Sequence, residues 1–202
     1  KAYDVRGRIP DQLNEDVARR IARAYAEGIQ PGSVVVGHDI RLTSESIKAA
    51  LIEGLREQSV SVLDIGLCGT EEIYFATAHL GVGGGIAVTA SHNPKDYNGM
   101  KFVREGSKPI SGDSGLLDIR SLAERNAFTP AVSRGKLTAV STLGAYIEHL
   151  LSYVDIATVA PLKIVCTAGN GGAGRVVEAL EPHLPFEVSK VRPEPAGHVP
   201  NT

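Results

Sequence analysis

The segment richest in reactive side chains is Thr89-Ala90-Ser91-His92-Asn93-Pro94, which follows an apolar, glycine-rich stretch. Ser91 can act as a nucleophile only if a neighbouring group takes its proton or if it is already held in a modified form, because a free serine hydroxyl is weakly nucleophilic at neutral pH. His92 or the nearby Lys101 could serve as that partner. Ser, Asn and Pro also favour turns, so a plain turn is an equally good interpretation of the segment.

Charged side chains mark two further loops. Arg6, in a loop ahead of the first expected helix, is either a solvated surface cation or a guanidinium whose planar fork faces a phosphate. His38, Asp39 and Arg41 directly follow an apolar stretch, and we interpret them as a structural ion pair and turn.

A glycine-rich turn over Gly169–Gly174 matches the G-x-G-x-x-G pattern of dinucleotide-binding loops. Such loops are normally followed after about 20 residues by an acidic residue at a strand end. Glu187 comes too early and Glu194 too late for that role. We therefore interpret the glycines as a tight turn between a strand and a helix.

Composition excludes several classes of function. The chain of 202 residues has 21 Lys and Arg against 23 Asp and Glu, a net charge of −2, and no basic block, so no nucleic-acid partner is expected. No apolar run approaches the roughly 18–20 residues of a membrane span, and no signal peptide is recognisable, so we expect a cytoplasmic location. Cys68 and Cys166 lack the spacing of a zinc site or a disulfide framework.

Helix and strand patterns alternate along the chain, which is 43% hydrophobic and 22% charged as in ordinary globular proteins. The strands are near-continuously apolar, which favours an α/β fold with a mixed, largely parallel sheet sandwiched by helices. Ligands of such sheets collect at the carboxyl ends of the strands. Strands are expected over 33–37, 60–66, 85–89, 100–103, 162–166 and 186–191, and helices over 13–28, 44–55, 70–79, 112–124, 146–154 and 175–180.

Polar residues and helix breakers over 126–135 predict a linker. We expect one domain over residues 1–137, with the Ser91 loop, and an incomplete start of a second, similar α/β domain over 138–202. The chain lacks an initiator Met and ends in an apparent loop, so we expect a fragment.

These motifs together resemble the N-terminal portion of the phosphomannomutase/phosphoglucomutase (α-D-phosphohexomutase) family. The resemblance runs nearly end to end, and Ser91-His92-Asn93-Pro94 is its most specific part. Two further segments are similar to bacterial phosphomannomutases, which favours mannose over glucose. The segments that carry the resemblance are 1–7, 39–44, 89–94, 96–101, 169–171 and 197–201, and the two that favour mannose are 69–75 and 109–113.

The resemblance implies a phosphoryl transfer reaction. In its resting state Ser91 would be a phosphoserine. The enzyme would interconvert hexose 6-phosphate and hexose 1-phosphate through a hexose 1,6-bisphosphate intermediate. Lys101 would be the acid/base and His92 would assist it. The resemblance further implies that Arg6, Tyr3 and Asn98 bind the substrate or its phosphate.

Mg²⁺ is the metal that the family uses, bound through the Ser91 phosphate and through aspartates that this chain does not contain. The resemblance therefore implies that these 202 residues alone are inactive. The chain departs from the family pattern at His38, where Arg is frequent, and at Ala196-Gly197-His198, where Asp-Gly-Asn is usual. The first departure leaves the implied mechanism intact, whereas the second would weaken a loop at the domain interface.

Other functions remain open from the sequence. The chain could belong to a phosphoglucomutase, or it could be a stand-alone module that binds sugar phosphates. A serine hydrolase using Ser91 and His92 is disfavoured, because adjacent side chains on an extended backbone point apart and no G-x-S-x-G elbow is present. The sequence does not set the oligomeric state.

Overall fold

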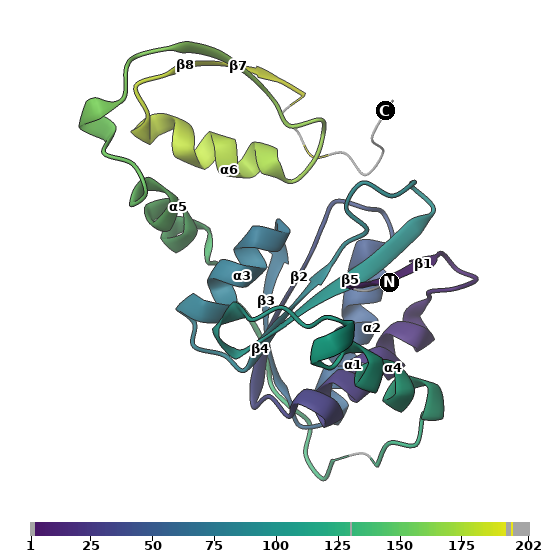
Figure 1. Cartoon of the computed structure of the whole chain (residues 1–202). Helices are drawn as coiled ribbons and strands as arrows, with labels where there is room; N and C mark the ends of the chain where they lie inside the picture. Colours follow the sequence, from purple (N-terminus) through teal and green to yellow (C-terminus); the bar gives the residue numbers. More distant parts are fainter. Residues whose placement is uncertain (1–2, 130, 193–194, 196–202) are drawn as a thin grey trace.

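A computed structural model describes residues 3–129, 131–192 and 195 (Figure 1). Lys1, Ala2 and the segment 197–201, which contribute to the family resemblance, lie outside these described residues. No helix in the described part of the chain is long and apolar enough to cross a membrane.

The main elements are β1 (Val5–Arg8), α1 (Glu15–Ile29), β2 (Ser33–His38), α2 (Ser44–Glu57), β3 (Ser61–Leu67), α3 (Thr70–His79), β4 (Gly84–Val88), β5 (Tyr97–Arg104), α4 (Leu116–Arg125), β6 (Leu137–Ala139), α5 (Leu143–Leu151), β7 (Lys163–Thr167), α6 (Ala173–Leu180) and β8 (Glu187–Val191).

The first six strands form one sheet in the order β1-β5-β4-β2-β3-β6. The pairs β4–β2, β2–β3 and β3–β6 are parallel, and β1–β5 and β5–β4 are antiparallel. The expected mixed, largely parallel sheet is therefore confirmed. Its parallel centre brings the carboxyl ends of β2, β3 and β4 to one edge.

Helices cover both faces of this sheet (Figure 1). The larger core lies where α1, α2 and α4 pack on one face, with the fully buried Tyr25 and Phe102 stacked at 5.6 Å between ring centroids. Tyr25 also donates a hydrogen bond of 2.9 Å to the carbonyl of Val103, which satisfies its buried hydroxyl. A smaller core lies under α3 on the opposite face.

Two strands of the sheet were not expected from the sequence. Residues 5–8, interpreted as a loop, form β1 and pair with β5, so Arg6 lies on a strand. Residues 137–139, just after the expected linker of 126–135, form β6 and pair with β3. Both strands are short and lack an apolar run, so their sequences carry little strand signal. The expected domain division after residue 137 falls inside β6 and stays a prediction.

The expected helix over 112–124 is interrupted. A 3₁₀ turn covers Gly112–Ser114, and α4 begins only after Gly115, whose φ is +123°. Glycine adopts such a φ without steric cost, so the chain breaks at this point.

The last part of the chain forms a separate, two-stranded parallel sheet of β7 and β8 with α6 packed against it (Figure 1). The glycine-rich segment before α6 is the expected tight turn, closed by a 2.8 Å bond from the amide of Gly171 to the carbonyl of Ala168. Arg175 of α6 donates a 2.6 Å hydrogen bond to the buried carboxylate of Glu72 in α3. Phe75 and Tyr146 join α3 to α5 with their ring centroids 5.4 Å apart.

Helices α1 and α2 approach closely at Gly54. A Cβ added at Gly54 would lie 2.4 Å from the carbonyl oxygen of Arg19 and 2.8 Å from the Cβ of Ala22. Helical Gly144 in α5 offers a matched comparison, because nothing lies within 4 Å of a Cβ built there.

We expect Gly54→Ala to lower the free energy of unfolding by about 1–3 kcal/mol, because the added methyl group forces the two helices apart. Gly144→Ala should change it by less than about 1 kcal/mol, in the stabilising direction, because alanine favours the helix. Urea unfolding of both variants checks this. Equal stability of the two variants would contradict the close packing of α1 on α2.

Candidate functional site: the Ser91 loop

The Ser91 loop, which we define as residues 89–97, lies at the carboxyl edge of the sheet. Strands β2 and β4 are parallel neighbours, with His38 opposite Val88. The amide of Asp39 also donates a 3.0 Å bond to the carbonyl of Val88. The loop after β2 and the loop after β4 therefore start side by side, as expected for adjacent parallel strands.

Ser91 occupies an exposed turn with a left-handed backbone. Its φ is +54°, a conformation that costs a non-glycine residue about 1–2 kcal/mol. The amide of Ser91 donates a 2.9 Å bond to the hydroxyl of Thr89, and the amide and side chain of Asn93 both bond to the carbonyl of Ala90, at 3.1 and 2.8 Å. The segment is therefore a turn, as one interpretation of the sequence had it, and the turn exposes the serine to solvent.

His92 lies beside the serine hydroxyl. The distance from Ser91 Oγ to His92 Nδ1 is 3.3 Å, and both side chains are exposed. The argument that adjacent side chains point apart was wrong here, because it assumed an extended backbone and Ser91 is left-handed. Among the described residues no carboxylate hydrogen-bonds to the other ring nitrogen of His92, so the orienting acid of a hydrolase triad is missing from this part of the chain.

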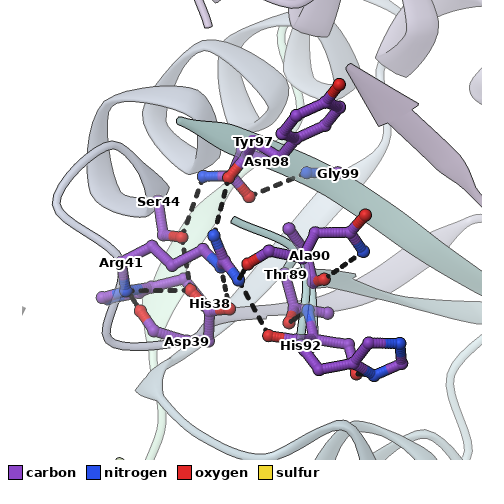
Figure 2. Close-up of polar contacts among 12 residues, drawn as sticks. His38, Asp39, Arg41, Ser44, Thr89, Ala90, His92, Tyr97, Asn98 and Gly99 are labelled. Atoms are coloured by element: carbon purple, nitrogen blue, oxygen red, sulfur yellow. Dashed lines mark hydrogen bonds and ion pairs between the residues drawn. The ribbon is translucent and has the colours of Figure 1, made fainter. Parts of the chain in front are cut away.

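Arg41 reaches from the loop after β2 into the Ser91 loop (Figure 2). Its Nη1 donates to the carbonyls of Pro94 and Tyr97, at 2.8 and 2.9 Å. Its Nη2 donates to the carbonyls of Ser91 and Asn93, at 2.8 and 2.6 Å. One guanidinium therefore holds four carbonyls of the loop, and burial lowers the pKa of Arg41 from its usual value.

A chain of hydrogen bonds links Arg41, through Asp39 and Ser44, to Asn98 on β5 (Figure 2). Asp39 accepts from the Arg41 amide at 3.0 Å and from the Ser44 hydroxyl at 2.5 Å, and its other oxygen lies 3.5 Å from Arg41 Nε. The amide of fully buried Asn98 donates to Ser44 Oγ at 3.0 Å and to Thr43 Oγ1 at 2.9 Å. Its oxygen accepts from the Gly99 amide at 2.8 Å.

The expected ion pair and turn of Asp39 and Arg41 are confirmed, but the reach of Arg41 into the Ser91 loop was missed. The signal was present, since both loops were placed at carboxyl ends of strands in a largely parallel sheet. The order of the strands was not known from the sequence, so the two loops could not be joined.

Arg6 packs over Gly99, its partner in the pairing of β1 with β5. A Cβ added at Gly99 would lie 2.9 Å from Arg6 Cδ and 3.0 Å from the carbonyl oxygen of Thr89, so the lack of a side chain there makes room for Arg6. The side chain of Arg6 is only 6% exposed, and its Nε and Nη2 bond to Asp4 at 2.9 and 2.8 Å. Its buried Nη1 has no hydrogen-bond partner among the described residues.

The remaining expected site residues have different environments. Lys101 is half-buried on β5, two residues beyond Gly99 and on the same face, and no described residue forms a hydrogen bond or ion pair with its side-chain ammonium. Tyr3 is 76% exposed. Asn98, expected to bind substrate, is 0% exposed and its side-chain donors are directed at Thr43 and Ser44, so it is not open to a ligand in this structure.

A cavity of about 320 Å³ lies next to the loop, between the carboxyl edge of the sheet and the start of α6. Thr89 contributes to its wall and Ser91 does not. Cys68 also lines it, and burial raises the pKa of this thiol to about 12, so it is protonated at neutral pH. In the described part of the chain no three His, Cys, Asp or Glu side chains are grouped so that they could hold a metal ion.

Comparison with known proteins identifies the family. Residues 1–130 match the family model described as phosphoglucomutase/phosphomannomutase, alpha/beta/alpha domain I. The chain belongs to this family. A phosphomannomutase of Escherichia coli is 56% identical over 209 residues, and a protein of Xanthomonas campestris named phosphohexose mutases is 55% identical over 201 residues. Both alignments cover 100% of this chain.

A solved structure has the same fold. It is a phosphoglucomutase/phosphomannomutase family protein from Burkholderia thailandensis, with a TM-score of 0.89 and 34% identity over 100% of this chain. The chain spans only 46% of the E. coli protein, 45% of the X. campestris protein and 45% of the B. thailandensis chain. It therefore represents less than half the length of these members of the family.

We expect Asn98→Ala to lower the free energy of unfolding by at least about 2 kcal/mol, because it leaves the buried Gly99 amide without its acceptor and the Ser44 and Thr43 hydroxyls without the amide that donates to them. Tyr3→Phe, at an exposed residue, should change it by less than about 0.5 kcal/mol. Urea unfolding measures both. An Asn98→Ala variant of unchanged stability but weaker affinity for hexose phosphates would instead make Asn98 a substrate ligand.

Proposed function

We propose that the chain carries the phosphoserine loop of a phosphohexomutase that interconverts hexose 6-phosphate and hexose 1-phosphate. The observation that carries this proposal is the Ser91 loop, where an exposed serine hydroxyl lies 3.3 Å from His92 Nδ1 and is held on a backbone clamped by Arg41. Membership of the phosphoglucomutase/phosphomannomutase family supports the same reaction.

In the proposed reaction, phosphorylated Ser91 is the donor. A hydroxyl of the hexose monophosphate attacks phosphorus, the bond from phosphorus to Ser91 Oγ breaks, and a hexose 1,6-bisphosphate forms. The hydroxyl proton leaves the sugar, and one proton is delivered to Ser91 Oγ. The bisphosphate then returns its other phosphoryl group to Ser91, so the net change is movement of phosphate between C6 and C1. Such a transfer depends chiefly on positioning and charge neutralisation.

The side chains around the loop have distinct proposed roles. Lys101 carries the proton of the sugar hydroxyl, because it is half-buried and has no fixed partner among the described residues. His92 exchanges a proton with Ser91 Oγ over 3.3 Å. The unpartnered Nη1 of Arg6 is a donor for a phosphate oxygen, because a buried guanidinium N–H without an acceptor is unfavourable until an anion fills its place. Tyr3 is proposed to contact the substrate, because its side chain is exposed.

Mg²⁺ and a hexose 1,6-bisphosphate are the cofactors of the proposal. A phosphate on Ser91 offers hard oxygen ligands of the kind that Mg²⁺ prefers. The described residues group no further metal ligands around it, so the ion would need ligands in addition to this phosphate. It would supply positive charge next to the transferred group.

Mannose is the proposed sugar, since the E. coli relative is named a phosphomannomutase. Glucose is the alternative, because the family model includes phosphoglucomutases. We further propose that the enzyme works in the cytoplasm on a free hexose phosphate.

We expect Ser91 to take up one phosphoryl group from glucose or mannose 1,6-bisphosphate in the complete protein, and to lose it to a hexose monophosphate. Intact mass and peptide mapping follow both steps. Ser91→Ala should abolish the adduct, whereas Ser133→Ala, at an exposed serine, should leave it unchanged. A chain that binds hexose phosphates but never becomes phosphorylated would be a binding module instead.

We expect Lys101→Met to lower kcat on the order of 10²–10⁴-fold, the usual loss when an acid/base group is removed. Phosphorylation of Ser91 should still be detectable by mass, because the serine itself remains. A pH–rate profile that is unchanged in Lys101→Met would remove Lys101 from the proton-transfer role.

A further inference from the structure

Every N–H group of the Arg41 side chain is directed at an acceptor. A guanidinium has five N–H donors in a fixed planar fork. Four are directed at the carbonyls of Ser91, Asn93, Pro94 and Tyr97, at 2.6–2.9 Å. The fifth, on Nε, faces Asp39 Oδ2 at 3.5 Å. The Nη donors of Arg41 are therefore all taken by carbonyls, and none is left for a substrate phosphate.

The four carbonyl oxygens converge on one point, an arrangement that is electrostatically unfavourable by itself. Carbonyl oxygens carry partial negative charge and repel one another when they face a common centre, unless a cation lies between them. Arg41 supplies that cation, and its side chain is only 14% exposed. The same contact holds the left-handed Ser91, whose φ of +54° would otherwise tend to relax.

The bonds of Arg41 also tie both ends of the loop to the sheet (Figure 2). One end is held at Ser91, just beyond β4, and the other at Tyr97, the first residue of β5. Asn98 then bonds to Ser44, Ser44 to Asp39, and Asp39 back to Arg41. This closed set of contacts leaves the loop little freedom to move as a unit.

We propose that Arg41 is the positioning residue of the Ser91 loop: it fixes the place of Ser91 Oγ through the four carbonyls and does not contact the transferred phosphoryl group. Arg6, with its unpartnered Nη1, is the arginine that meets the anion. The proposal rests on the proposed function, because it gives Arg41 a role in the phosphoryl transfer of Ser91.

Arg41→Lys is the informative change. A lysine keeps the positive charge, but its ammonium has three donors on a flexible stem and cannot reach four carbonyls in a planar fork. A displacement of a reacting atom by about 1 Å can cost on the order of 100-fold in rate. We therefore expect kcat to fall about 100-fold in the complete protein, while KM for the hexose phosphate changes less than about 3-fold, since no substrate contact is removed.

Loop order is measured independently of activity. Hydrogen exchange of the amides in residues 91–97 should become faster in Arg41→Lys. Arg41→Ala should lose more activity than Arg41→Lys and recover part of it when guanidinium ion is added, because the free ion can occupy the space between the carbonyls. Arg120→Lys, at an arginine 71% exposed in α4, is the matched control and should leave exchange and kinetics unchanged.

The outcomes separate the two roles. A rise in KM with unchanged kcat in Arg41→Lys, or unchanged exchange of residues 91–97, would overturn the positioning role.

If Arg41→Lys does not fold, Asp39→Asn replaces it, because this change weakens the support of Arg41 and leaves the four carbonyl bonds. Slower turnover with faster exchange of residues 91–97 is then the expected result. Unchanged exchange of these residues would contradict the proposal. Full mutase activity in Ser91→Ala would refute the proposed function, whereas the exchange data would still report whether Arg41 orders the loop.

Discussion

The parallel pairing of β2 with β4 is the constraint on which the candidate site depends. Two parallel neighbours end at the same edge of the sheet, so the loop with Arg41 and the loop with Ser91 have to meet. A buried guanidinium then needs an acceptor for each N–H, and the carbonyls of the Ser91 loop supply four of them. The requirement to satisfy Arg41 and the requirement to hold a turn in an unfavourable conformation are met by the same contacts.

Two arginines at this edge of the sheet differ in how fully their N–H donors are hydrogen-bonded, and this difference supports the different roles proposed for them. The two Nη nitrogens of Arg41 donate four hydrogen bonds and its Nε forms an ion pair with Asp39, whereas Arg6 has one buried nitrogen without a partner among the described residues. An anion gains more from a donor that is unsatisfied in its absence than from one that must first give up a carbonyl. Gly99 allows this arrangement, because any side chain there would collide with Arg6 and with the backbone of Val5.

Sequence patterns predicted the central layers of the fold well and its edges poorly. Apolar runs such as 33–37 and 85–89 predicted buried parallel strands, because burial on both faces leaves a continuous apolar signal. Strands β1 and β6 lie at the edges of the sheet, where pairing depends on a neighbour far along the chain. Ser91 and His92 were proposed as site residues from residue type, but their 3.3 Å contact was not predicted, since it depends on a left-handed φ that serine rarely adopts. Asn98 was predicted to bind substrate from the family motif alone, and a motif does not distinguish a residue that binds substrate from one that holds the loop in place.

The contacts that order the Ser91 loop all come from the six-stranded sheet and its helices. Arg41, Asp39, Ser44 and Asn98 belong to elements between β2 and β5, and the large core beneath them is contributed by α1, α2 and α4. None of these contacts involves β7, β8 or α6, whose two-stranded sheet leaves Val165 75% exposed. The geometry of the serine is therefore set within one layered unit. In the proposed reaction, further substrate contacts can therefore be supplied from outside this unit without changing the geometry of the Ser91 loop.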